Sequence, residues 1–147
     1  NNGELKKAVE IYTDIIHSEP TPTAPVLAVI HKHRGMAYFA DNDYERALGD
    51  FCKSVEYDPA AFRSYYYIGI VQSIRGENAS AVESFSRSLE LNGYQSHAHF
   101  RRAISYFELG EYEKSLSDLN AARALGLDEK ECRSLNDKLV KKLGMGM

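Results

Sequence analysis

A repeat of constant period runs through this chain and limits the folds that it can adopt. Small residues recur at Gly35, Gly69 and Ala103, each 34 positions after the last. Three further sets keep the same step: Ala47, Ala81 and Ser115; Phe51, Phe85 and Leu119; and Ser54, Ser88 and Ala122. A period of this length is typical of supersecondary units that stack side by side, and a closed helical bundle has no reason to show it.

Each unit is predicted to be a pair of helices joined by a tight turn. The apolar residues between Tyr44 and Val55 recur at steps of three and four, which places them on one face of a helix. Turn and helix-capping residues stand at Asp41 to Asp43, Arg75 to Asn78 and Gly110 to Glu111. The sequence therefore predicts an all-α fold, an α-solenoid of stacked antiparallel helix pairs.

The motifs inside the three units carry a resemblance to a known family. The first unit reads His31-x-x-Arg34-Gly35-x-x-Tyr38, Ala47-x-x-x-Phe51 and Pro59. The second reads Tyr65-x-x-Ile68-Gly69-x-x-Gln72 and Ala81-x-x-x-Phe85, and the third reads His99-x-x-Arg102-Ala103-x-x-Tyr106 and Ser115-x-x-x-Leu119. This pattern resembles that of the tetratricopeptide repeat family. The resemblance implies a right-handed superhelix whose concave wall, built by the first helix of each unit, binds a peptide or a partner's helix.

The repeat phase predicts one domain over residues 1–147, divided into five segments. Residues 1–20 are the second helix of a preceding repeat, with Ala8-x-x-x-Tyr12 in the expected register. Residues 28–61, 62–95 and 96–127 are the three repeats, and residues 128–143 form a capping helix that begins at Asp128. Because the chain begins inside a unit, we expect the parent protein to extend further, and we expect residues 144–147 to be frayed.

The tripeptide Asn78-Ala79-Ser80 has two interpretations. It matches a glycosylation sequon, and the same residue types also suit the N-cap of a helix. Because it follows a turn and precedes an apolar helical pattern, we predict the cap.

Composition and charge exclude several classes of protein. A net charge of −3 and an isoelectric point near 6.0 argue against binding to nucleic acid along the whole chain. The longest apolar runs are far shorter than the roughly 20 residues that cross a bilayer, so no membrane insertion is expected. The two cysteines, Cys52 and Cys132, lie far apart in the sequence and form no C-x-x-C pair. They fit reduced thiols better than a disulfide framework, which favours the cytoplasm.

No motif in the chain indicates catalysis, a cofactor or a metal ion. It has no glycine-rich phosphate loop, no G-x-S-x-G and no H-E-x-x-H. In each of the pairs His31 and His33, and His97 and His99, one residue separates the histidines, so each pair points to nearly opposite faces of a helix and cannot chelate. His31 and His99 are expected at the edge of the core, and the protein is predicted not to be an enzyme.

Two positions change together among the units. Arg34 and Arg102 share a slot in the first helices, and Asp50 and Asp118 share a slot in the second helices. The middle unit has Ile68 and Ser84 at these slots. We therefore predict ion pairs between Arg34 and Asp50 and between Arg102 and Asp118. The alternative is that both arginines extend to water.

The helical period also predicts which residues face the concave wall. This peptide-binding groove consists of Lys32, His33, Met36, Phe39, Arg63, Tyr66, Tyr67, Ile70, His97, Phe100, Arg101 and Ile104. The set is aromatic and basic although the chain is acidic, which favours an acidic peptide as the ligand. The alternative is that these side chains pack against neighbouring helices or the capping helix.

One subfamily of the resembling repeats binds the C-terminal carboxylate of Hsp70 and Hsp90 with lysine, asparagine and arginine side chains. The matching positions here are Lys32, Met36, Tyr67, His97 and Arg101. Lys32 and Arg101 agree with that pattern and His97 is a partial substitute, whereas Met36 and Tyr67 replace the amide donors. The departure predicts a different peptide, whose side chains stack on Tyr66, Tyr67 and Phe100.

Three functions are compatible with these observations. The preferred one is a peptide-binding interaction module within a larger scaffold or adaptor. The second is an architectural segment of a solenoid that self-associates through its open ends. The third is an RNA-binding helical repeat, against which the low isoelectric point and the few lysines of the first helices argue.

Overall fold

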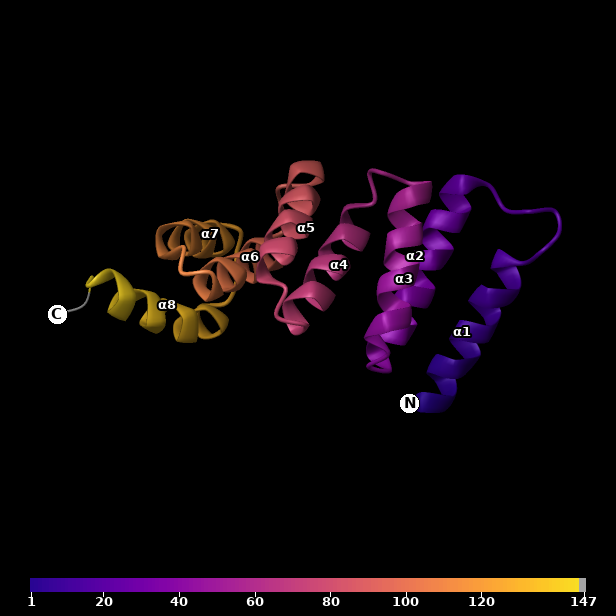
Figure 1. Cartoon of the computed structure of the whole chain (residues 1–147), viewed down its shortest axis with the longest axis horizontal. Helices are drawn as coiled ribbons and strands as arrows, with labels where there is room; N and C mark the ends of the chain where they lie inside the picture. Colours follow the sequence, from indigo (N-terminus) through magenta and orange to yellow (C-terminus); the bar gives the residue numbers. More distant parts are fainter. Residues whose placement is uncertain (146–147) are drawn as a thin grey trace. The chain divides into compact units, whose positions relative to one another are not determined.

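The computed structural model describes residues 1–145, and within them the chain forms eight α-helices and no strand (Figure 1). The helices are α1 (Asn2–Ile16), α2 (Ala24–Ala40), α3 (Tyr44–Tyr57), α4 (Phe62–Ile74), α5 (Asn78–Leu91), α6 (Ser96–Glu108), α7 (Tyr112–Ala124) and α8 (Glu129–Leu143). The predicted all-helical fold is confirmed.

The chain divides into two compact units, the first over Asn1–Ile68 and the second from Gly69 onward, with the division inside α4. In the first unit, α2 packs against both α1 and α3. In the second unit, α6 packs against α5 and α7, and α8 packs against α7 with a smaller contact to α6. Each unit is therefore a stack of antiparallel helix pairs, as the repeat period predicts.

The turns inside the three helix pairs share one backbone conformation. Asn42, Gly76 and Gly110 are spaced by exact repeat periods and have φ angles of 59°, 78° and 77°. This left-handed region costs little for glycine, and asparagine tolerates it better than most residues. The repeat period therefore also holds for the φ angle of the turn residue that follows the first helix of each pair.

Close contact between paired helices explains the small-residue positions. A Cβ atom added to Gly35 would lie 2.8 Å from the Phe51 ring, and one added to Gly69 would lie 2.7 Å from the Phe85 ring. Both phenylalanine side chains are completely buried. The helices approach closely enough for the aromatic ring to fill the space above the glycine.

Two helix starts agree with the sequence-based expectations, and a third does not. Helix α2 begins at Ala24 with proline in its first turn, and the Asp128 side chain accepts a hydrogen bond from the Lys130 N–H (2.9 Å) at the start of α8. The predicted cap at Asn78 is wrong: Asn78 is the first residue of α5, and Glu77 precedes it without a side-chain capping bond.

At the C-terminal end, Gly144 adopts the left-handed conformation that closes α8. The rest of the expected frayed end includes residues 146 and 147, which lie outside the described residues. Within residues 1–145, no helix combines the length and the apolar character that spanning a membrane requires.

Candidate functional site

The first repeat contains a buried ion pair at the predicted position. The Arg34 Nε and Nη2 atoms each donate to an Asp50 carboxylate oxygen at 2.8 Å. Asp50 is only 4% exposed, and the His31 Nδ1 atom lies 2.8 Å from its Oδ1 atom. Hydrogen bonding to Asp50 raises the pKa of Arg34, so the guanidinium is charged throughout the accessible pH range.

The third repeat reproduces this arrangement. The Arg102 Nε and Nη2 atoms donate to Asp118 at 2.6 and 2.7 Å, and the His99 Nδ1 atom lies 3.0 Å from Asp118 Oδ1. Both predicted ion pairs are therefore confirmed. Sequence reasoning missed that His31 and His99 join them, although both histidines occur only in the repeats that carry the arginine.

Each arginine also reaches the second helix of the preceding repeat. The Arg34 Nη1 atom donates to Thr13 Oγ1 on α1 (3.1 Å), and the Arg102 Nη1 atom donates to Ser86 Oγ on α5 (3.0 Å). We call the histidine, arginine, aspartate and hydroxyl together the arginine clamp. Through the clamp, one guanidinium connects three helices.

The middle repeat has no clamp. Ile68 is buried at the arginine slot, and the Ser84 Oγ atom donates to Gln72 Oε1 (2.7 Å). The charged network is replaced there by apolar packing and one neutral hydrogen bond.

The predicted groove residues of the first unit differ in their exposure. Met36 and Arg63 are exposed, and Lys32, His33, Phe39 and Tyr66 are partly buried. Tyr67 packs in the core, where its ring stacks on Phe51 with the centroids 5.0 Å apart. Tyr67 therefore offers a ligand little of its ring.

The predicted groove residues of the second unit are largely covered by the chain itself. Phe100 and Ile104 pack against the cluster that includes Leu135 and Leu139 of α8. Ile70 is buried, with 8% of its surface exposed. Only His97 and Arg101 are exposed, and the His97 Nε2 atom lies 3.8 Å from Glu131 on α8.

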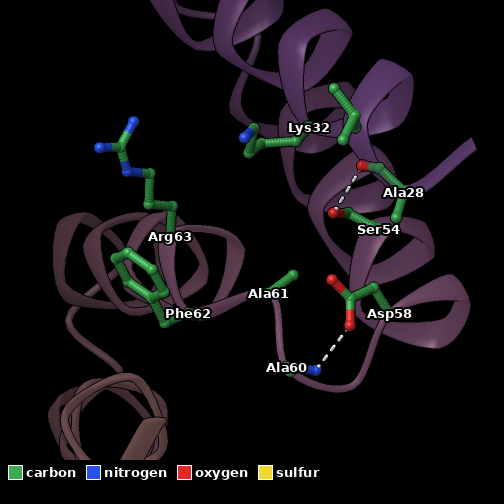
Figure 2. A pocket seen from close by; sticks show the side chains of 9 residues that line it. Ala28, Lys32, Ser54, Asp58, Ala60, Ala61, Phe62 and Arg63 are labelled. Carbon is green, nitrogen blue, oxygen red and sulfur yellow. Dashed lines mark hydrogen bonds between the residues drawn. The ribbon is translucent and has the colours of Figure 1, made fainter. Parts of the chain in front are cut away.

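A pocket of about 320 Å³ opens in the first unit beside two of the predicted cations (Figure 2). Lys32 comes from α2 and Arg63 from the start of α4, and the turn from Asp58 to Ala61 forms the opposite side. The pocket is lined by Ala28, Val29, Lys32, Ser54, Asp58, Ala60, Ala61, Phe62 and Arg63. The helical period predicts the two cations at the groove but not the pocket, because alanines in a turn form no motif.

The charges around this pocket are mostly positive. Among the described residues, no carboxylate lies within 4.0 Å of the charged nitrogens of Lys32 or Arg63. The Arg63 guanidinium lies 5.8 Å from the centre of the Phe62 ring. Burial, Lys32 and Arg63 lower the pKa of His33, whose ring stacks on Tyr12 of α1 with the centroids 6.0 Å apart. The pocket can therefore attract an anion.

Metal binding has no support in the described part of the chain. No group of three histidine, cysteine, aspartate or glutamate side chains there could hold a metal ion. Cys52 and Cys132 are both free thiols.

Stacked antiparallel helix pairs that repeat with a constant period define a helical-repeat protein. The chain belongs to the tetratricopeptide repeat family, whose pattern matches residues 32–96 and again residues 75–129.

Individual relatives and structures agree with this assignment. The chain is 27% identical over 140 residues to Superkiller complex protein 3 of Mus musculus, a match that covers 91% of this chain and 8% of the mouse protein. It is 29% identical over 130 residues to Photosystem I assembly protein Ycf3 of Rippkaea orientalis, covering 85% and 75% of the two chains. The first TPR of Spaghetti (RPAP3) bound to HSP90 peptide SRMEEVD has a TM-score of 0.78 at 21% identity, covering 82% of this chain and 95% of that one.

Proposed function

We propose that this chain is a protein–protein interaction module that binds an acidic peptide segment of a partner, within a larger scaffold or adaptor. The observation that carries the proposal is the pocket of about 320 Å³ in which Lys32 and Arg63 have no carboxylate partner among residues 1–145. Pockets of this size are at the lower end of those that bind ligands, and they suit a few side chains of an extended peptide.

The chemistry of the pocket favours a carboxylate. A lysine and an arginine can both form charge-assisted hydrogen bonds to it, and the arginine can do so through two N–H groups. Exposed apolar residues nearby, Val29 and Met36 on α2, add contact area for the rest of a peptide. The solved TPR of RPAP3 holds an HSP90 peptide that ends in Glu-Glu-Val-Asp, which supports an acidic ligand for this chain.

The binding mode is proposed to differ from a clamp built on asparagine amides. Met36 and Tyr67 stand where such amides are expected, and Tyr67 is committed to the core. The contacts are instead assigned to Lys32 and Arg63, with His33 beside them.

A display selection from a library of random short peptides tests this function. We expect the selected peptides to be enriched in aspartate and glutamate, and the double variant Lys32→Glu with Arg63→Glu to lose them. The matched control is Lys53→Glu, because Lys53 is exposed, pairs with Glu56 and lies outside the pocket. Selection of peptides without acidic residues, or equal binding by the double variant, would contradict the proposal.

Self-association is a second candidate, favoured by one observation. Helix α1 has no buried residue, and its Ile11 side chain is 58% exposed. Positions equivalent to Ala8 and Tyr12 are completely buried in α3 and α5, whereas Ala8 and Tyr12 are only partly buried. Sedimentation velocity over a range of concentrations would show a dimer that Ile11→Asp dissociates; a monomer throughout would exclude this function.

A further inference from the structure

Two equivalent turns show which part of Asp58 the fold requires. Between α3 and α4, the Asp58 Oδ1 atom accepts a hydrogen bond from the Ala60 N–H (2.9 Å). Between α5 and α6, the Asn92 Oδ1 atom accepts the same bond from the Tyr94 N–H (3.0 Å). Since Asn92 lies one repeat period after Asp58, the protein itself shows that a neutral amide supports this turn. The negative charge of Asp58 is not needed for it.

The second carboxylate oxygen of Asp58 has no partner in the described part of the chain. Among residues 1–145, no donor bonds to its Oδ2 atom and no cation lies within 4.0 Å of the carboxylate. Asp58 is half-buried and lines the pocket, across from Lys32 and Arg63 (Figure 2). The pocket therefore has two cations on one side and a free acceptor with a negative charge on the other.

The same comparison explains the space beside Asp58. In the second turn, the Gln95 Nε2 atom donates to the backbone oxygens of Ser88 (3.0 Å) and Asn92 (2.7 Å). The residue equivalent to Gln95 in the first turn is Ala61, which has no atoms beyond Cβ to fill such a position. The first turn thus lacks the side chain that occupies the second.

We propose that the pocket binds a peptide segment with charges of both signs, in which a lysine or arginine contacts Asp58 Oδ2 and a nearby acidic residue contacts Lys32 and Arg63. This inference rests on the proposed function and specifies its ligand. The ligand is thereby narrowed from any acidic peptide to an acidic peptide that has a basic residue close to an acidic one.

The physical reason is desolvation. A ligand with carboxylates alone would exclude water from Asp58 without supplying a donor, and it would bring like charges together. An ammonium or guanidinium group at Asp58 removes both penalties and adds an attractive pair. Polar groups enclosed by a ligand must be matched one by one, so the pocket discriminates between peptides of equal acidity.

The display selection is repeated with Asp58→Asn, a variant that Asn92 shows to be compatible with the turn. We expect peptides selected by the unaltered chain to carry lysine or arginine within two positions of an acidic residue. Peptides selected by Asp58→Asn should stay acidic but lose this enrichment. An unaltered chain that selects acidic peptides without basic neighbours overturns the inference and leaves the proposed function intact, whereas selection of no acidic peptide overturns both.

Calorimetry on one selected peptide completes the test. Replacing its basic residue by norleucine should weaken binding to the unaltered chain by about tenfold, a typical effect of losing one close charge pair. The same replacement should change binding to Asp58→Asn by less than about twofold. Equal losses for the two chains would overturn the inference. Asp58 would then serve only the turn, through the hydrogen bond that its Oδ1 atom accepts from the Ala60 N–H.

Discussion

The first and third repeats connect their helices through the arginine clamp, whereas the middle repeat uses Ile68 and a hydrogen bond from Ser84 to Gln72. The three repeats nevertheless keep the same period and a left-handed residue at the same turn position. The difference teaches that the helix pair itself does not need a buried ion pair. Once an aspartate is present, however, the arginine and histidine become dependent on it.

The largest expected effect comes from removing one member of a clamp. Asp50→Ala leaves the partly buried Arg34 guanidinium without its carboxylate, and it should lower the free energy of unfolding by about 3–5 kcal/mol. Ser84→Ala in the middle repeat removes one neutral hydrogen bond and should cost about 0.5–1.5 kcal/mol. Urea unfolding of both variants measures the difference.

The control places three residues of the middle repeat at the equivalent positions of the first repeat. The triple variant His31→Tyr, Arg34→Ile and Asp50→Ser removes the whole charged group at once, so it should be more stable than Asp50→Ala alone. A triple variant that is no more stable than the single one would mean that the clamp contributes net stability and that the two kinds of repeat are not interchangeable.

The next effect concerns the contact between paired helices. Gly35→Ala places a Cβ atom against the Phe51 ring and should cost about 1–3 kcal/mol, which exceeds the gain in helix propensity. The third repeat has Ala103 opposite Leu119 at the same positions. Adding Phe51→Leu should therefore recover part of the loss in urea unfolding, and no recovery would contradict this explanation.

A smaller effect, of opposite sign, is expected at Ser105 in the third repeat. Its hydroxyl is completely buried and is the one buried side-chain oxygen or nitrogen in residues 1–145 without a hydrogen-bond partner. The first repeat has Ala37 at this position. Ser105→Ala should raise the free energy of unfolding by about 1 kcal/mol, because it removes an unsatisfied polar group. A loss of stability in thermal unfolding would show that the hydroxyl has a partner.

The smallest effect is on proton binding at His33, whose counterpart in the third repeat is Arg101. The pKa of His33 lies below the ordinary value of 6.5, because burial and the charges of Lys32 and Arg63 oppose protonation. The folded chain thus binds this proton less readily than the unfolded chain, so the contribution of His33 to stability is lost as the pH falls below 6.5.

Titration of His33 by NMR measures this pKa. Lys32→Gln and Arg63→Gln should each raise it, since each removes a nearby positive charge, and Lys53→Gln should leave it unchanged. If the pKa of His33 is the same in the first two variants as in the unaltered chain, the charges of Lys32 and Arg63 do not act on His33.

The sequence predicted the repeats well because their positions follow from packing within one period. Gly35 and Phe51 are complementary in size, and the joint change at the slots of Arg34 and Asp50 is enough to predict the ion pair. Tertiary contacts between non-equivalent residues were harder to predict. The helical period left the packing of Phe100 against α8 open as an alternative to the groove. The pocket beside Asp58 arises where side chains are small, so it leaves no periodic signal.

The bond from each clamp arginine to the hydroxyl of the preceding helix affects how such an array can be rearranged. Thr13 and Ser86 each lie in the helix that precedes the repeat whose arginine they bind. The equivalent residue before the middle repeat is Cys52, and that repeat has no arginine that needs a hydroxyl. A duplicated or transplanted segment of one period would carry the donor without its acceptor. The smallest piece that can be exchanged intact is therefore a helix pair together with the helix before it, and shuffling experiments should cut the chain accordingly.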